Sequence, residues 1–115
     1  MSRRRPSSGA AKQQVNANVF AALGHKARLS LVAQLSSGQP RSISQLTQGS
    51  RLTRQAITKH LRVLESVEMV HSVRVGRESL FELDPHPMEQ LRRYLDLVSE
   101  HWHQALSRLK SFVER

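Results

Sequence analysis

The hydrophobic positions of the chain follow a helical period over much of its first third. Apolar residues recur three or four positions apart in residues 15–23 and again in residues 29–35, and a glycine, Gly24 or Gly38, follows each run. This spacing places the apolar side chains on one face of a helix, and glycine commonly ends a helix. The pattern therefore predicts two helices joined by a short segment at residues 24–26.

A second pair of helices, joined by a tight turn, is predicted next. Ser42 is followed three residues later by Gln45, a capping-box pattern that predicts the start of a short helix ending near Gly49. Thr53 is a suitable N-cap for a further helix over residues 54–65. Together these elements predict a helix–turn–helix pair.

The second helix of this pair separates its polar and apolar residues completely when it is drawn at about 100° per residue. Its apolar arc contains Ala56, Ile57, His60, Leu61, Val63 and Leu64. Its polar arc contains Arg54, Gln55, Thr58, Lys59, Arg62 and Glu65. Such a helix packs one face on a core and presents a mostly cationic face to a partner. We interpret His60, within the apolar arc, as a partly buried structural histidine rather than a pH switch.

The period then changes from helical to extended. Residues 69–83 are rich in Val and Phe and are interrupted at Gly76-Arg77. Glycine in the first position of a two-residue loop is typical of a type II′ hairpin turn. A small β-hairpin is therefore predicted, followed by a break at Pro85 and Pro87.

A long final helix has the most regular pattern in the chain. Its apolar residues step alternately by three and four positions: Met88, Leu91, Leu95, Val98, Trp102, Ala105, Leu109 and Phe112. A period of 3.5 is typical of helices that pack along one another. The helix would be about 37 Å long, more than the preceding elements need for a core. It packs on its own domain, on another chain, or on both through separate apolar lines.

The cations are concentrated in the first part of the chain. Residues 1–64 contain eleven Lys or Arg and no Asp or Glu, whereas residues 65–115 contain seven bases and nine acids, giving the net charge of +9. A strongly positive region joined to a nearly neutral one indicates a polyanion-binding surface next to a region with another role. Solubility alone remains the alternative reading of this charge.

Composition disfavours several classes of function. The chain contains no cysteine, which excludes disulfides, thiolate metal sites and thiol catalysis and fits a reducing cytosol. No apolar run approaches the roughly 20 residues of a membrane span, so we expect neither a span nor a signal peptide. No glycine-rich phosphate loop and no nucleophile with an identifiable base is present, so we expect no enzyme.

Residues 1–12 are predicted to be a disordered basic arm, and residues 13–115 a single domain.

Three motifs occur in a fixed order along these elements: ALGHKARL, ITKHLRVLE and GRESLFEL. In this order they resemble the ArsR family of winged-helix bacterial repressors, over residues 19–112. The resemblance implies a mainly α fold with a small β-hairpin wing, that is, a winged helix-turn-helix that dimerises through its first and last helices. It further implies a cytoplasmic, nucleoid-associated homodimer that binds an inverted-repeat operator in double-stranded DNA and represses transcription.

By this resemblance the helix from residue 54 to residue 65 lies in the major groove, with Arg54 and Gln55 nearest the base edges. The predicted DNA contacts are Ser42, Arg51, Arg54, Gln55, Thr58, Lys59, Arg62, Arg74 and Arg77. Arg51, Lys59 and Arg62 are predicted to contact phosphates, and the wing arginines either contact DNA or merely guard a strand edge. The predicted dimer contacts are Val15, Val19, Leu91, Leu95, Val98, Trp102, Leu109 and Phe112.

The sequence departs from the family pattern at two places. Glu68 stands where a glycine usually precedes the wing, so a positive φ there would be disfavoured by about 1 kcal/mol or more, or the turn would differ. The cysteine pair of the metal sensors is absent. Asp84-Pro85-His86 matches half of a second family metal site, but Leu97 and Glu100 stand at the later positions. We therefore predict no metal site and no cofactor, and interpret Asp84-Pro85-His86 as the start of the final helix.

Two other classes of function remain open. A basic architectural protein that binds nucleic acid without reading its sequence would need the same positive region. A protein-interaction module would use the final helix, with the cations serving only solubility. The sequence identifies neither the operator nor any effector.

Overall fold

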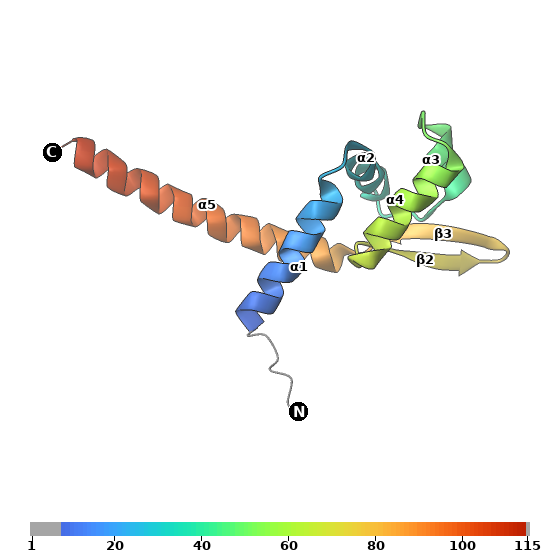
Figure 1. The fold of residues 1–115 in the computed structure, drawn as a ribbon, viewed down its shortest axis with the longest axis horizontal. Helices are drawn as coiled ribbons and strands as arrows, with labels where there is room; N and C mark the ends of the chain where they lie inside the picture. The colour runs from blue at the N-terminus through green and yellow to red at the C-terminus, as the bar shows by residue number, and fades with distance from the viewer. Residues whose placement is uncertain (1–7, 115) are drawn as a thin grey trace, which may run out of the picture.

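Helices and a small antiparallel sheet follow one another in the order predicted for a winged helix-turn-helix (Figure 1). The computed structural model describes residues 8–114. The elements are α1 (Ser8–Leu23), α2 (Lys26–Leu35), β1 (Arg41–Ser42), α3 (Ile43–Gln48), α4 (Arg54–Ser66), β2 (Val70–Val75), β3 (Glu78–Leu83) and α5 (Pro85–Val113). The predicted fold class, mainly α with a hairpin wing, is confirmed.

The N-terminal boundary of the first helix differs from the prediction. Helix α1 begins at Ser8, so residues 8–12, predicted as part of a disordered arm, are helical. The reason is local: this stretch contains two Ala and one Lys and is followed by two Gln, and all of these are good helix formers even without an apolar period. The rest of the predicted arm, residues 1–7, lies outside the described residues.

The helix starts are fixed by side-chain caps at the predicted positions. The Ser42 hydroxyl accepts a hydrogen bond from the Gln45 backbone N–H at 3.1 Å, and the Gln45 side chain accepts one from the Ser42 N–H at 2.9 Å, which completes a capping box. The Thr53 hydroxyl accepts from the Ala56 N–H at 3.1 Å. These caps satisfy N–H groups that have no partner within the helix, so they set where α3 and α4 begin.

One hydrophobic core joins α1, α2, α3, α4, the sheet and the start of α5. Helix α4 contributes its apolar arc, with Ile57, Leu61 and Leu64 all fully buried. It packs on α2, α3 and β2. The other core residues are Val19, Ala22, Leu31, Val32, Leu35, Leu46, Met69, Val70, Phe81 and Leu91. These three contacts fix the orientation of α4 and leave its polar arc facing outward.

The sheet has the strand order β1-β3-β2, and all neighbours are antiparallel. The hairpin was predicted, but β1 was not. Val75 pairs with Glu78 across Gly76-Arg77, and Gly76 has a φ of +61° whereas Arg77 does not have a positive φ, as a type II′ turn requires. Because Ser42 of β1 pairs with Leu80, the start of α3 is attached directly to the wing.

Glu68 adopts the left-handed conformation that the family glycine would favour, with a φ of +61°. The Glu68 N–H donates to the Glu65 carbonyl at 2.9 Å, and the Met69 N–H donates to the Leu64 carbonyl at 3.0 Å. This pair of bonds is the Schellman arrangement that ends a helix with one left-handed residue. The turn into the wing is therefore retained despite the glutamate.

Helix α5 leaves the rest of the chain after its first turns and projects outward (Figure 1). The Cα radius of gyration is 18.9 Å, whereas a compact chain of this length would have about 13 Å. The start of α5 packs on α1, and the Phe20 and Tyr94 rings meet edge to face at 6.1 Å. No other helix or strand of the described part of the chain covers the remainder of α5. Of the helices in the described part of the chain, none is long and apolar enough to cross a membrane.

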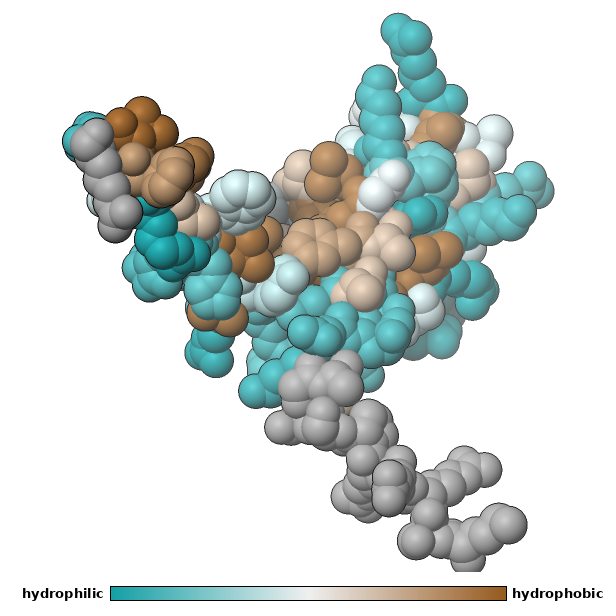
Figure 2. All heavy atoms as spheres, turned by 60° about the vertical axis from the view of Figure 1, so that its left-hand side comes forward, coloured by the Kyte–Doolittle hydropathy of each residue, from teal (hydrophilic) through white to brown (hydrophobic). Residues whose placement is uncertain are grey.

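The apolar seam of α5 changes from buried to exposed along the helix. Leu91 is 5% exposed, whereas Leu95 is 49%, Trp102 64% and Phe112 69% exposed. Figure 2 shows apolar side chains gathered at the projecting end of the molecule. Two of the predicted dimer contacts are thereby corrected: Leu91, and Val19 at 2% exposed, belong to the core of the chain itself and have almost no surface left for a partner.

Candidate nucleic-acid interface

The polar arc of α4 forms an exposed cationic face, which we call the α4 face. The side chains of Arg54, Gln55, Lys59 and Arg62 are exposed along it, and Thr58 is half-buried between them. The residues of this face, with Thr53 and Ala56, line an open concavity of about 750 Å³. The prediction that these five residues share one outward surface is confirmed, because the three buried leucine and isoleucine side chains of α4 fix its rotation.

The cations of the α4 face are not neutralised by acids. Three ion pairs occur within residues 8–114: His71 with Glu82, Arg92 with Glu89, and Lys110 with Glu114. None of them involves α4. The positive charge of this helix is therefore available to attract an anion, such as a nucleic-acid phosphate.

Arg54, at the first position of α4, is held by α3. Its Nη1 donates to the hydroxyl oxygen of Ser44 at 2.7 Å. The Thr58 hydroxyl donates to the backbone carbonyl of Arg54 at 2.8 Å, so the hydroxyl hydrogen of Thr58 is already used. Ser44 was not among the predicted site residues, because a separation of ten residues gives no sign of this contact.

The turn before α4 and the start of α3 supply further predicted groups. Arg51 is exposed in the turn between the two helices, and the turn is stabilised by the Ser50 hydroxyl, which accepts from the Leu52 N–H at 3.0 Å. The Ser42 hydroxyl oxygen is occupied as a cap acceptor, but its hydrogen is free to donate. Arg51 thus precedes the N-cap of α4 by two residues, and Ser42 is the N-cap of α3.

The wing places two more cations at the edge of the molecule. Arg74, in β2, and Arg77, in the hairpin turn, are both exposed. Between α4 and the wing lies a groove of about 310 Å³, lined by Ile43, Thr58, Arg62, Glu65, Ser72, Ser79 and Phe81. The groove is shared, because Thr58 and Arg62 of the α4 face line one part of it and Ser72 and Ser79 of the wing strands line another.

Arg41, in β1, was not among the predicted site residues. It is half-buried, and its Nε is a buried polar atom without a hydrogen-bond partner. It precedes Ser42, so its position is fixed by the pairing of β1 with β3. The only sequence signal for it was its place in the acid-free first part of the chain.

His60 lies on the inner side of α4 beside two cationic groups. Its ring centroid is 4.5 Å from that of His25, and its Nδ1 is 3.4 Å from Nη1 of Arg28. Burial lowers the pKa of His60 from its usual value, and the nearby charges of His25, Arg28 and Lys59 lower it further. Arg28 also donates from Nε to the Ala22 carbonyl at 2.6 Å, so this cluster connects the end of α1 to α4.

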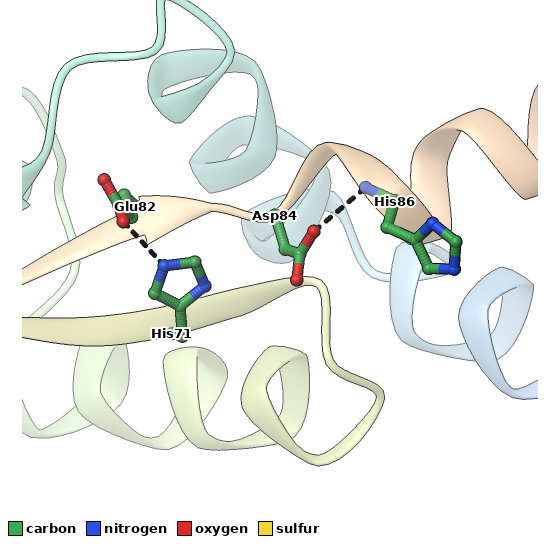
Figure 3. Close-up of polar contacts among 4 residues, drawn as sticks. All are labelled: His71, Glu82, Asp84 and His86. Atoms are coloured by element: carbon green, nitrogen blue, oxygen red, sulfur yellow. Dashed lines mark hydrogen bonds and ion pairs between the residues drawn. The ribbon is translucent and has the colours of Figure 1, made fainter.

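The segment that resembles half of a metal site serves to start α5. Asp84 is the N-cap, and its carboxylate accepts from the His86 backbone N–H at 2.9 Å, while the His86 ring points away from that carboxylate (Figure 3). On the neighbouring strands, His71 and Glu82 pair with each other at 2.6 Å. No group of three or more potential metal ligands occurs in the part of the chain that the structure describes.

Comparisons with known proteins agree with this geometry. A helix-turn-helix domain family matches residues 23–73. An ArsR-like transcriptional regulator from Rhodococcus sp. RHA1 is 31% identical, with a TM-score of 0.77, over 89% of this chain and 95% of that chain. The chain belongs to the ArsR family. It is therefore a DNA-binding transcriptional regulator with a helix-turn-helix.

Two further proteins extend the comparison. The HTH-type transcriptional regulator Rv2034 of Mycobacterium tuberculosis is 28% identical over 93 residues, which cover 81% of this chain and 83% of the relative. A winged helix-turn-helix DNA-binding domain from Mycobacterium bovis, described as homodimeric, has a TM-score of 0.63 at 20% identity, over 93% of this chain and 95% of that domain. At that identity the second likeness concerns the fold.

Proposed function

We propose that this ArsR-family protein is a homodimeric repressor that binds an inverted-repeat operator by placing α4 in the major groove. The observation that carries the proposal is the α4 face: a fully amphipathic helix, anchored by buried side chains, whose outward cations have no acidic partner among residues 8–114. A helix with an exposed polar arc of this kind fits the major groove of B-DNA.

The roles proposed for the α4 residues follow from their place along the helix. Arg54 and Gln55 stand at its N-terminal end, the end nearest the base edges, where arginine can bond guanine and glutamine can bond adenine in a bidentate manner. Lys59 and Arg62 stand further along and, with Arg51, contact phosphates. Thr58 offers its methyl group to thymine. The wing arginines, Arg74 and Arg77, reach an adjacent backbone.

The proposed dimer uses the exposed part of the α5 seam. Leu95, Trp102 and Leu109 are all about half exposed or more in the single chain, and Val15 of α1 is exposed as well. A regular apolar seam without a cover favours a second helix along it. Two copies related by a two-fold axis would place their α4 helices about 34 Å apart, one turn of DNA. Repression, rather than activation, is what the family resemblance implies.

Selection of bound sequences from random duplex DNA tests this proposal. The purified protein is mixed with random duplexes at near-physiological salt and excess nonspecific competitor, and the bound DNA is sequenced. An enriched inverted repeat with half-sites one turn apart is expected. A reporter gene placed behind that repeat should then be transcribed less when the protein is present.

Matched variants separate reading from positioning in the same experiment. Gln55→Ala should change the enriched sequence, whereas Lys59→Ala should lower affinity for all DNA and reduce the slope of log affinity against log salt by about 1. Binding without any enriched motif would favour a sequence-indifferent architectural protein. A protein that forms dimers but does not bind DNA would instead be an interaction module.

A further inference from the structure

The contact between Ser44 of α3 and Arg54 of α4 has a consequence for sequence reading. The two residues are ten positions apart, and their contact crosses the turn of the helix-turn-helix. Both side chains belong to exposed residues, so the bond is not enforced by burial. It is enforced by the frame on either side of it.

Both ends of this contact are rigidly held. Ser44 is in the first turn of α3, whose start is closed by the reciprocal capping box of Ser42 and Gln45. Arg54 follows the N-cap Thr53, and its carbonyl accepts an additional hydrogen bond from Thr58. The guanidinium is therefore attached to two fixed helix starts rather than to one flexible side chain.

The contact leaves the useful edge of the guanidinium free. Ser44 occupies Nη1, and among the described residues Nε and Nη2 of Arg54 make no hydrogen bond. Nε–H and Nη2–H form one of the two parallel pairs of donors in arginine, which suits the two acceptors of guanine. Arginine loses considerable rotamer freedom when it is immobilised, and holding it beforehand reduces that cost on binding.

We propose that Ser44 is a positioning residue for base recognition: it holds Arg54 so that the Nε–Nη2 edge faces the base, without itself reading the sequence. This inference rests on the proposed function, in which Arg54 reads a base. Ser44 would then affect the preference at the base pair that Arg54 contacts and have little effect on binding elsewhere.

The test compares Ser44→Ala, Ser44→Thr, Arg54→Ala and the double variant Ser44→Ala with Arg54→Ala. Each is measured for affinity to the enriched operator, to the operator changed at one base pair, and to nonspecific DNA. The matched control is Ser30→Ala, which removes the hydroxyl of an exposed serine in α2. Thermal unfolding of every variant establishes that it is folded.

Ser44→Ala is expected to weaken operator binding about 3- to 10-fold. It should also reduce discrimination at the same base pair that Arg54→Ala affects, with nonspecific affinity unchanged. Ser44→Thr retains the hydroxyl and should restore binding. In the Arg54→Ala background, removal of the Ser44 hydroxyl should have no further effect.

Equal losses of affinity for all DNA would overturn the inference, because they would make Ser44 a phosphate ligand. Independent effects of Ser44→Ala and Arg54→Ala would overturn it as well. Both results presuppose that the unsubstituted protein enriches a motif, so they leave the proposed function standing. If the unsubstituted protein enriches no motif, the proposed function fails and this inference fails with it.

Discussion

The helix-turn-helix with its wing and the projecting part of α5 contrast in how they use apolar residues. In the first region Leu35, Leu46 and Leu61 are fully buried within the single chain. In the second, from about residue 95 onward, equally large apolar side chains are half exposed or more. The first region has its own buried core in a single copy, whereas the second has the pattern of a packed helix but no partner within residues 8–114.

This difference indicates a division of labour. The core fixes the orientation of α4, so the α4 face is formed within a single copy of the chain. In the proposed dimer, the exposed seam of α5 would set the distance and symmetry between two such faces once a second copy covers it.

Truncating the core should affect stability regardless of assembly. Leu61 is fully buried under the α4 face, and Leu61→Ala is expected to lower the free energy of unfolding by about 2–5 kcal/mol. Urea unfolding monitored by circular dichroism would measure this loss at two protein concentrations. The loss should be present at both concentrations. A loss confined to high concentration would place Leu61 in the interface instead.

Truncating the seam should affect association and leave the fold of the single chain intact. Trp102 is 64% exposed at the middle of the proposed interface, and Trp102→Ala is expected to weaken dimerisation by about 2 kcal/mol or more, roughly 30-fold. Sedimentation equilibrium would measure the dissociation constant. His103→Ala, one residue further on the helix and off the seam, is the control. Equal effects of the two variants would contradict the assignment of the seam.

The sequence predicted the first region more completely than the second for physical reasons. Caps such as Ser42 and Thr53 act within one helical turn, so a local pattern identifies them. The rotation of α4 follows from its own amphipathic arc. By contrast, a heptad pattern does not distinguish the stretch of a helix that packs within its own chain from the stretch that packs on a partner. Leu91 is buried in the core, while Leu95, one turn later, is exposed.

Contacts between secondary-structure elements were the hardest features to predict from the sequence. Strand β1 has only two residues, too few to show an alternating pattern, and it forms because the chain passes beside β3. The bond between Ser44 and Arg54 depends on how α3 crosses α4, which no spacing encodes. The half-buried position of Arg41 has the same origin. These are the details that place side chains at the site, and they follow from tertiary packing.

Relieving the backbone strain of the left-handed Glu68 should make the helix-turn-helix and its wing more stable. Glu68→Gly removes the steric cost of a positive φ, partly offset by the greater flexibility of glycine in the unfolded chain, and is expected to raise the free energy of unfolding by up to about 1 kcal/mol. Chemical denaturation would measure the gain. Glu68→Ala removes the same carboxylate but retains the strain, so it should give no such gain. Equal stabilisation by both variants would attribute the effect to charge instead.

The smallest effect expected within the helix-turn-helix and its wing is a pH dependence of the free energy of unfolding that originates at His60. Burial and the charges of His25, Arg28 and Lys59 lower the pKa of His60 below its ordinary 6.5 in the folded state. The unfolded chain therefore binds this proton first as the pH falls, so stability is complete above about pH 6.5 and declines below it until the folded state is protonated as well.

Unfolding measured between pH 5 and pH 7.5, at constant protein concentration and ionic strength, would show this decline. His60→Gln should flatten the curve in that range, because glutamine remains neutral on both sides of the transition. His101→Gln, which replaces an exposed histidine on the projecting part of α5, is the matched control and should retain the slope of the unsubstituted protein. If His101→Gln flattened the curve and His60→Gln did not, the pH dependence would originate in the assembly of α5 rather than in the packing behind α4.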